Sequence, residues 1–201
     1  MQWTIIIPVK GGASAKSRLL PADLALARAI ALDTIAAAVG ASLVSRVIVP
    51  TSDAEMVDAV TDLGAHPLLE SAPRGIAAAI DLALADVSGD RAVLLGDLPA
   101  LRPEDLDAAL ALAAAHPATF VADDEGTGTT LVTARGGVPF VSAFGEGSAQ
   151  AHRELGLVEL PVAAASRLRH DVDTAAQLAA AEQLGLGAFS RAVRADPASA
   201  V

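Results

Sequence analysis

The sequence predicts an α/β fold with a mostly parallel central sheet, helices on both faces of the sheet and an antiparallel addition. In the first half of the chain, short apolar runs alternate with Ala- and Leu-rich helical stretches. Such alternation requires crossover connections and therefore parallel strands. In the second half, two strand-like segments flank an Asp- and Gly-rich turn, which predicts an antiparallel pair. Because 53% of the 201 residues are hydrophobic, the chain can bury a substantial core.

Apolar runs that end at polar or turn-forming residues predict the strands of the first half. Trp3–Pro8 is apolar almost throughout, as expected of a strand buried on both faces. Val44–Val49, His66–Leu69 and Arg91–Leu95 are predicted as the next three strands. If helices connect these strands, all four run in the same direction, and their carboxyl ends meet at one edge of the sheet.

Prolines and capping residues delimit the helices between these strands. Pro21 stands in the first turn of a helix predicted to end at Val39. The Thr-Ser-Asp sequence at 51–53 can cap a helix that ends near Leu63, just before a glycine. A third helix is predicted over Gly75–Asp86.

The second half adds one more long helix and a set of short strands. Pro103 places proline in the first turn of that helix, and two acids follow at its positive end. The remaining expected elements are strands at Thr119–Ala122 and Thr129–Thr133, a loop entering a helix at Gly145–Leu155, a strand at Val158–Pro161, a helix capped by Asp173 or Thr174 and ended by Gly185, and a loose tail at 186–201. No linker or internal repeat interrupts the sequence, so a single domain over 1–201 is expected.

Composition and charge exclude several classes of protein. The net charge of −10 argues against binding to nucleic acid polymers and to anionic membranes. The chain has no cysteine, which excludes disulfides, thiolate zinc sites and cysteine nucleophiles. No apolar run reaches transmembrane length, and the N-terminus begins a strand in place of a signal peptide. A soluble cytoplasmic protein is therefore expected.

Asp97 is the residue that most directly indicates a functional site. It follows the apolar strand Arg91–Leu95 and precedes a Leu-Pro-Ala-Leu sequence that leads into a helix. A carboxylate at the end of a buried strand costs several kcal/mol unless a metal ion, a cation or hydrogen bonds compensate it. We interpret Asp97 as a metal ligand, with a helix cap or a turn former as the alternative.

A small-residue loop with three cations follows the first strand, from Lys10 to Arg18. Gly11 and Gly12 allow backbone N–H groups to approach phosphate, while Lys16 and Arg18 can neutralise the charge of a triphosphate. The loop has neither P-loop nor GxGxxG spacing, and a solvated surface loop is the alternative. Three cations together in an acidic chain favour an anion site.

Two further segments supply candidate ligands. Asp171 and Asp173 precede the last predicted helix, and alternation points both carboxylates the same way, so one can cap the helix while the other binds metal. Phe144–Ser148 is a glycine-rich entry into a helix, whose free N–H groups and dipole suit a phosphate or carboxylate. A plain loop–helix junction is the alternative for this segment. Asp123–Glu125 is expected to be a solvated turn.

Several motifs occur together along the chain, namely Ile7-Pro8-Val9-Lys10 with Ala15-Lys16-Ser17-Arg18-Leu19, Gly96-Asp97-Leu98-Pro99-Ala100-Leu101, Phe144-Gly145 with Ser148 and His152, and Asp171-Val172-Asp173-Thr174. In order and spacing they resemble the guanylyltransferases that make the activated phospholactate or phosphoenolpyruvate unit of a deazaflavin coenzyme. The resemblance extends from residue 2 to about residue 185. One departure is Ala77, where the family often has Asn in a Gly-Leu-Asn sequence.

The resemblance implies a nucleotidyltransferase fold of the glycosyltransferase-A type. It also implies a reaction that joins GTP to phosphoenolpyruvate or 2-phospho-L-lactate and releases diphosphate. Mg²⁺ would bind Asp97 and Asp171 or Asp173, and Lys16 and Arg18 would join Asp97 in catalysis by stabilising the leaving diphosphate. The remaining implied contacts are Thr130, Gly145 and Ser148 to the acceptor, and Lys10, Gly11, Gly12, Lys16 and Gly75 to the nucleotide. Monomer and homodimer both remain open.

Other functions are possible on the same fold. A molybdenum-cofactor guanylyltransferase or a sugar-nucleotide transferase is the alternative enzyme, against which the short chain and small polar acceptor loop argue. A non-catalytic nucleotide-binding module is the alternative of another class. Between the two acceptors we favour phosphoenolpyruvate, because the Ala-, Arg- and Asp-rich composition suggests a GC-rich bacterial genome.

Overall fold

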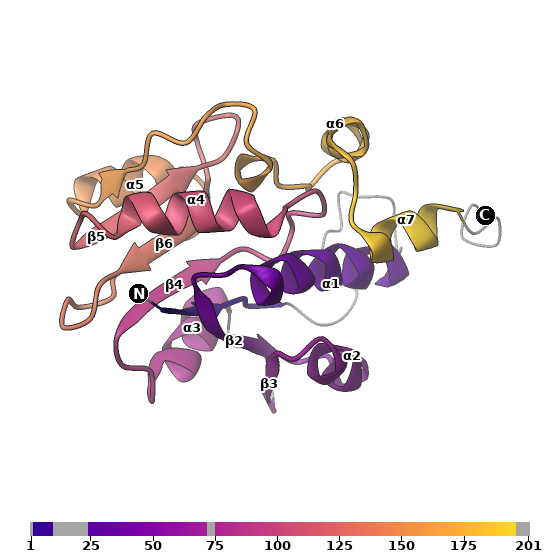
Figure 1. The fold of residues 1–201 in the computed structure, drawn as a ribbon, viewed down its shortest axis with the longest axis horizontal. Helices are drawn as coiled ribbons and strands as arrows, with labels where there is room; N and C mark the ends of the chain where they lie inside the picture. Colours follow the sequence, from indigo (N-terminus) through magenta and orange to yellow (C-terminus); the bar gives the residue numbers. More distant parts are fainter. Residues whose placement is uncertain (1, 10–23, 72–74, 196–201) are drawn as a thin grey trace.

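The structure, a computed structural model, describes residues 2–9, 24–71 and 75–195 (Figure 1). Within these ranges, seven strands form one sheet in the order β3-β2-β1-β4-β6-β5-β7. The strands are β1 Trp3–Ile6, β2 Val44–Thr51, β3 His66–Leu69, β4 Asp90–Leu94, β5 Ala118–Ala122, β6 Thr129–Ala134 and β7 Val158–Glu159. β6 is antiparallel to its neighbours β4 and β5, whereas the other neighbouring pairs are parallel. The expected sheet, mostly parallel with an antiparallel addition, is confirmed.

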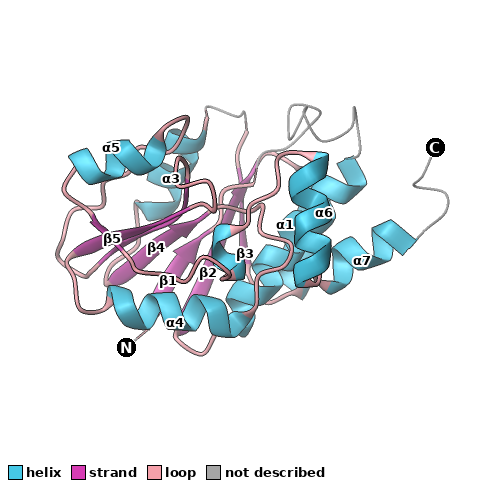
Figure 2. Ribbon diagram, turned by 90° about the horizontal axis from the view of Figure 1, so that it is seen from above, coloured by secondary structure: helices cyan, strands magenta, loops and turns pink. Residues whose placement is uncertain are grey.

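Helices cover both faces of this sheet. They are α1 Leu24–Gly40, α2 Val57–Asp62, α3 Ile76–Leu84, α4 Pro103–Ala113, α5 Ser148–Glu154, α6 Ala175–Leu184 and α7 Ala188–Ala195, with 3₁₀ turns at Ala54–Met56 and Arg167–Arg169. Figure 2 shows α1 and α4 on one side of the sheet and α3 and α5 on the other. None of the described helices is both long and apolar enough to cross a membrane.

The central strand β1 is buried on both faces, as its apolar sequence predicts. Ile5 lies in the main core cluster together with Ile35 of α1 and Leu106 of α4. Ile6 points to the opposite face of the sheet and packs with Ile80 of α3. Both β1 side chains are 0% exposed. Two helical layers therefore remove water from the two sides of the strand, and a polar residue would be unfavourable on either side.

A side-chain cap begins the 3₁₀ turn that follows β2. Asp53 accepts a hydrogen bond from the backbone N–H of Glu55 at 3.1 Å and so caps the 3₁₀ turn Ala54–Met56. The single helix expected to end near Leu63 is therefore a 3₁₀ turn followed by α2. The cap lies at the carboxyl end of β2, and this position brings the Asp53 side chain to the edge of the sheet where ligands bind.

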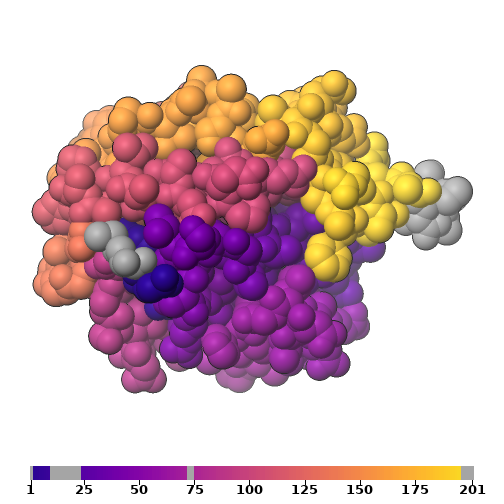
Figure 3. Space-filling view, in the orientation of Figure 1, coloured from indigo at the N-terminus to yellow at the C-terminus, as the bar shows by residue number. Residues whose placement is uncertain are grey.

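The expected loose tail is wrong for residues 186–195. Leu186 is buried, and Ala188–Ala195 form α7. This helix packs against α1, and in Figure 3 the C-terminal residues (yellow) lie directly on the purple segment that contains α1. The described part of the chain therefore includes a C-terminal helix that the apolar pattern does not indicate.

A carboxylate from α1 holds the start of α7. Asp33 is buried, and its two oxygens accept hydrogen bonds from the backbone N–H groups of Phe189 and Ser190, each at 2.9 Å. Gly187 permits this approach, because a Cβ there would lie only 2.1 Å from Asp33 Oδ1. Asp33 thus acts as a helix cap supplied by a distant part of the chain, and local sequence cannot predict it.

We expect Asp33→Ala to lower the free energy of unfolding by roughly 2–3 kcal/mol, because two charge-assisted hydrogen bonds to α7 are lost. Asp33→Asn keeps one acceptor oxygen and should lose about half as much. Urea denaturation measures both changes. Asp81→Ala, at an exposed position of α3, is the control, and equal midpoints for Asp33→Ala and Asp81→Ala would contradict the capping role.

Candidate functional site

A cleft of about 940 Å³ opens at the edge of the sheet where the parallel strands end. Val9, Asp53 and Asp97, which follow β1, β2 and β4, contribute to one part of its lining. Ser148 and Asp171, from the start of α5 and the loop before α6, contribute to another. Ligands of sheets of this kind bind beyond the carboxyl ends of the strands, so the cleft is the candidate substrate site.

The described lining of the cleft is strongly acidic. Among the residues described, Arg28 is its only basic side chain, and it already pairs with Asp53 through Nε–Oδ2 and Nη2–Oδ1 contacts of 2.7 and 3.0 Å. The acidic side chains of the lining are Asp53, Glu70, Asp97, Asp123, Glu125, Glu146, Asp171 and Asp173. Such a concentration of carboxylates attracts cations, and it repels phosphate groups unless cations lie between them.

The cationic loop of the sequence prediction lies outside the described residues. The residues concerned are Lys10, Gly11, Gly12, Lys16 and Arg18. Their roles in triphosphate binding and catalysis therefore remain predictions. Val9 and Leu24, the described residues on either side of this segment, both line the cleft.

Asp97, Asp171 and Asp173 all line the cleft. The backbone N–H of Val172 donates a hydrogen bond to the carbonyl oxygen of Asp97 at 2.9 Å, which joins the two loops directly. Val172 is 0% exposed and packs into the apolar cluster beside α1 and α6. The side chain of Val172 points inward, and both aspartates that flank it line the cleft, as expected if alternation directs them the same way. Their role as metal ligands stays a prediction.

Asp171, one of the acidic residues that line the cleft, has a strongly shifted pKa. Burial, together with the negative charges of Asp97, Asp123 and Asp173, raises the pKa of its carboxyl to about 8. Its Oδ1 atom is buried and has no hydrogen-bond partner among the described residues. A carboxyl group in this position is unfavourable when ionised unless a positive charge approaches it.

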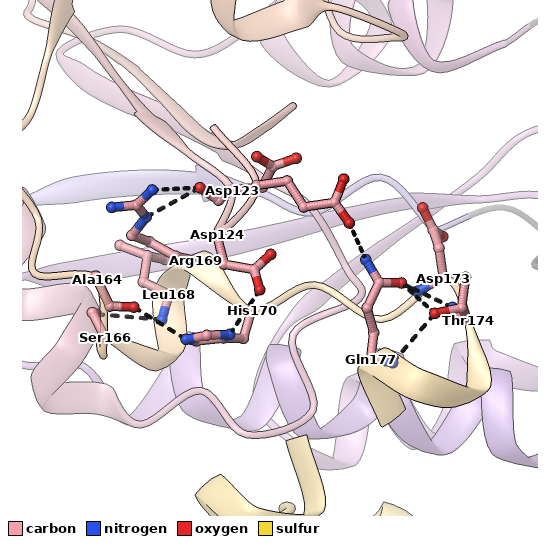
Figure 4. Close-up of polar contacts among 11 residues, drawn as sticks. Asp123, Asp124, Ala164, Ser166, Leu168, Arg169, His170, Asp173, Thr174 and Gln177 are labelled. Atoms are coloured by element: carbon pink, nitrogen blue, oxygen red, sulfur yellow. Dashed lines mark hydrogen bonds and ion pairs between the residues drawn. The ribbon is translucent and has the colours of Figure 1, made fainter. Parts of the chain in front are cut away.

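The cap of α6 is Thr174, which resolves one alternative left by the sequence. Thr174 Oγ1 accepts from the backbone N–H of Gln177 at 3.2 Å, and Gln177 Oε1 accepts from the N–H groups of Thr174 and Asp173 at 2.9 and 3.0 Å (Figure 4). This reciprocal pair is a capping box. The Asp173 carboxylate is therefore not the cap of this helix, and Gly185 ends the helix as predicted.

Asp123 belongs to the site, and its assignment to a solvated turn is wrong. Its side chain is only 8% exposed and lines the cleft. Its two oxygens accept hydrogen bonds from the backbone N–H groups of Thr127 and Gly128 at 2.9 and 2.7 Å. The Asp-x-x-x-Thr-Gly spacing is the signal that could have indicated this buried turn, because a short carboxylate bonds nearby backbone groups readily.

The segment that carries Asp171 is fastened to the same turn. Arg169 donates from Nε and Nη2 to the carbonyl oxygen of Asp123 at 3.1 and 2.6 Å, and its own carbonyl accepts from Asp124 N–H at 2.8 Å. His170 Nδ1 lies 3.4 Å from Asp124 Oδ2 (Figure 4). These contacts fix Asp171 relative to Asp123 by protein groups alone, so this part of the site is preformed.

The loop before α5 differs from its prediction in one respect. Ser148 is 2% exposed and lines the cleft, as does Gly145. However, the first N–H groups of α5 are already engaged, since Ser148 donates to Gly145, Ala149 to Thr127 and Gln150 to Gly147, all at 3.1–3.2 Å. The prediction that free helix N–H groups point at a ligand is therefore wrong for these three groups.

Thr130 and Gly75, the two other predicted ligand contacts, lie in different surroundings. Thr130 is 0% exposed, and its hydroxyl has no hydrogen-bond partner in the described part of the chain, whereas Thr129 lines the cleft. Gly75 lines the cleft just before α3 with a φ of 92°, which an L side chain rarely adopts. Neither observation tests the predicted contacts to ligands.

The sequence is similar to a known protein family and to individual guanylyltransferases. Over residues 3–158 it matches the family described as "Guanylyl transferase CofC like". The phosphoenolpyruvate guanylyltransferase of Streptomyces scabiei is 44% identical over 209 residues, covering 97% of this chain and 97% of the relative. That of Thermomonospora curvata is 42% identical over 204 residues, covering 97% of this chain and 90% of the relative.

Solved structures share the fold at much lower identity. A nucleotidyl transferase from Methanothermobacter thermautotroptrophicus has a TM-score of 0.61 at 15% identity, covering 90% of this chain and 97% of the other. CMP:2-keto-3-deoxy-manno-octonic acid synthetase complexed with CTP has a TM-score of 0.57 at 17% identity, covering 92% and 98%. These likenesses show that the fold is nucleotidyltransferase-like, as the sequence predicts. With the family match and relatives above 40% identity, the chain belongs to the CofC-like guanylyl transferase family.

Proposed function

We propose that this protein transfers a guanylyl group from GTP to phosphoenolpyruvate, with 2-phospho-L-lactate as the alternative acceptor, and releases diphosphate. The observation that carries the proposal is the convergence of Asp97, Asp171 and Asp173 on one cleft in a chain of this family. Phosphoenolpyruvate comes first because relatives at 42–44% identity have that name. The product would serve the synthesis of a deazaflavin coenzyme, as the resemblance implies.

The acceptor requires no general base from the protein. A phosphate monoester has its second pKa at about 6, so at neutral pH an ionised oxygen is available. This oxygen attacks the α-phosphorus of GTP and forms a new P–O bond. The bond from the α-phosphorus to the bridging oxygen breaks, and diphosphate leaves with the electron pair. The protein then has to align the two substrates and neutralise their charge.

The carboxylates of the cleft suit Mg²⁺. The buried Oδ1 of Asp171, which has no hydrogen-bond partner among the described residues, supports this assignment. Magnesium at phosphate sites takes one or two carboxylates and completes its shell with phosphate oxygens and water. In the described part of the chain no group of three or more His, Cys, Asp or Glu side chains could hold an ion, so the proposed site requires phosphate oxygens of the substrates to complete it. Asp97 with Asp171 or Asp173 would hold the cation, which neutralises phosphate charge when bound.

The remaining groups divide between the two substrates. Gly145 and Ser148 line the cleft, which supports contacts of these two residues to the acceptor. Thr130, whose buried hydroxyl has no hydrogen-bond partner among the described residues, is proposed as the third contact, although Thr129 and not Thr130 lines the cleft. Lys16 and Arg18 would face the diphosphate as it leaves. The other proposed nucleotide contacts are Lys10, Gly11, Gly12 and Gly75.

Replacing residues of the acceptor loop should affect one substrate selectively. Ser148→Ala should cost about 1–3 kcal/mol of acceptor binding if its hydroxyl meets a charged group. Gly145→Val should act more strongly, because Gly145 has a φ of 142° that a β-branched residue does not adopt, although the space around its Cβ position is open. Saturation curves for each substrate measure the effects. A selective rise in the Michaelis constant for GTP would instead assign this loop to the nucleotide.

The predicted cations can be tested independently of their placement. Lys16→Ala and Arg18→Ala should each reduce kcat/KM for GTP by about a hundredfold, as expected when a group that faces developing charge is removed. Arg18→Lys should recover activity only in part if the guanidinium binds the phosphates in a bidentate way. Unchanged kinetics in both alanine variants would move the triphosphate elsewhere.

Product mass spectrometry tests the function itself. Purified protein is incubated with GTP, Mg²⁺ and either acceptor, and the guanylylated product and diphosphate are measured. Product with neither acceptor, but with a molybdenum cofactor precursor or a sugar phosphate, would favour the alternative enzyme. GTP binding without turnover on any of these would favour the non-catalytic module. The proposal also includes a cytoplasmic location, and sedimentation of the purified protein tests the homodimer.

A further inference from the structure

His152 is a buried histidine that the proposed chemistry does not use. It lies on α5, is 0% exposed and is not part of the cleft lining. Its ring packs between Phe120 of β5 and Phe144 of the loop before α5, with ring centroids 5.5 Å apart in each case. Two aromatic contacts leave the imidazole little freedom to rotate, so its two nitrogens have fixed directions.

Both nitrogens of this ring make hydrogen bonds, and together they determine its tautomer. The backbone N–H of Ala143 donates to Nε2 at 2.9 Å, so Nε2 carries a lone pair. The ring proton is therefore on Nδ1, which lies 2.9 Å from Thr129 Oγ1. Burial lowers the pKa of His152, and this outweighs the opposing effect of a hydrogen bond to the backbone of Ser148, in agreement with a neutral ring.

The two hydrogen-bond partners belong to two different segments of the chain near the cleft. Thr129, on β6, lines the cleft itself. Ala143 immediately precedes Phe144 and Gly145, which also line the cleft and belong to no helix or strand. The imidazole is therefore a rigid connection between a strand of the sheet and a loop without regular structure.

We infer that His152 is a positioning residue for the acceptor. By accepting from Ala143 at Nε2, it sets the distance between the loop Phe144–Ser148 and β6, and this distance determines how the acceptor phosphate is held. The inference rests on the proposed acceptor site. A role in proton transfer is excluded by the geometry, because the ring does not line the cleft and both nitrogens already have protein partners.

Two conservative substitutions separate the two hydrogen bonds. The side-chain oxygen of Gln can occupy the position of Nε2 and accept from Ala143, so His152→Gln keeps the contact to the loop. The side-chain amide of Asn reaches only the position of Nδ1, so His152→Asn keeps the contact to Thr129 and loses the contact to the loop. Positioning through Nε2 predicts that the Asn variant is the more defective of the two.

The experiment measures Michaelis constants for GTP and for phosphoenolpyruvate in the full-length protein. We expect His152→Asn to raise the constant for phosphoenolpyruvate at least about tenfold, the size of a hydrogen-bond loss of about 1.4 kcal/mol, and to change that for GTP less than twofold. His152→Gln should stay within about threefold of the wild type for both. Equal effects on the two substrates, or a lower Tm with unchanged constants in both variants, would overturn the inference.

Thr119→Val is a matched control for loss of a buried hydrogen bond. Thr119 is 0% exposed, and its hydroxyl lies 2.6 Å from that of Thr133 in the same pair of strands, outside the cleft lining. It should lower Tm without changing either Michaelis constant. If the wild type shows no guanylyl transfer, the proposed function fails, and amide hydrogen exchange of residues 143–148 then decides the positioning role. Faster exchange in the Asn variant than in the Gln variant supports that role, and equal exchange overturns it.

Discussion

Replacing Asp97 by Asn is expected to reduce diphosphate release by about a hundredfold or more, equivalent to roughly 3 kcal/mol of transition-state stabilisation. The amide has nearly the same shape but lacks the charge that binds a divalent cation. The neighbouring backbone contact, from Val172 N–H to the Asp97 carbonyl oxygen, does not depend on the side chain, so the fold should remain intact. Steady-state diphosphate release over a range of magnesium concentrations measures the effect.

The control for this prediction is Asp81→Asn, which removes one carboxylate from an exposed position of α3 outside the cleft lining. It keeps the change in net charge identical and should leave turnover unaltered. Near wild-type turnover in the Asp97 variant would remove Asp97 from the metal site. Equal losses in the two variants would show that global charge, not local ligation, is responsible.

Asp171→Asn is expected to remove both a pH dependence and a magnesium dependence of stability. In the metal-free protein the Asp171 pKa is raised to about 8 by burial and neighbouring carboxylates, against an ordinary value of 3.8. Between these two pH values the folded state holds a proton that the unfolded state has lost. Stability should therefore fall as pH rises from about 4 to about 8, by up to about 1.4 kcal/mol per pH unit. Asn has no proton to lose, so this contribution should vanish.

Urea denaturation at several pH values, with EDTA and with Mg²⁺, measures these dependences. Magnesium should stabilise the wild type most near pH 8, because the cation replaces the proton on Asp171. The Asn variant should gain little from magnesium, and Asp81→Asn should behave like the wild type. Identical pH profiles for the wild type and Asp171→Asn would show that Asp171 does not carry the shifted titration.

Those parts of the fold that depend on local pattern follow from the sequence. Ile5 and Ile6 occupy opposite faces of β1. A continuous apolar run predicts a strand that is covered on both faces. Asp97 was identifiable for the same reason, since a carboxylate directly after such a run has to lie at the ligand-binding edge. The flanking of Val172 by Asp171 and Asp173 required only the two-residue period of an extended chain.

Features that depend on distant partners could not be predicted in this way. α7 begins at a carboxylate on α1, Asp33, and nothing near residue 188 indicates that contact. The backbone N–H of Ala149 donates to the carbonyl oxygen of Thr127. The sequence suggests free N–H groups for an anion at the start of α5, but this one already has a partner. Asp123 reads as a surface residue because burial of its turn arises from the Arg169 segment that packs over it.

The hydrogen bond between Val172 and Asp97 has a consequence for how the protein is made. During synthesis Asp97 leaves the ribosome before β5, β6 and β7 are made, whereas Asp171 and Asp173 follow all seven strands that the structure describes. The nascent chain can therefore form the sheet before Asp171 and Asp173 bring their negative charges close to that of Asp97. A fragment that ends before Asp171 would keep the described strands but lack two of the three carboxylates proposed to bind Mg²⁺, and we expect it to be inert.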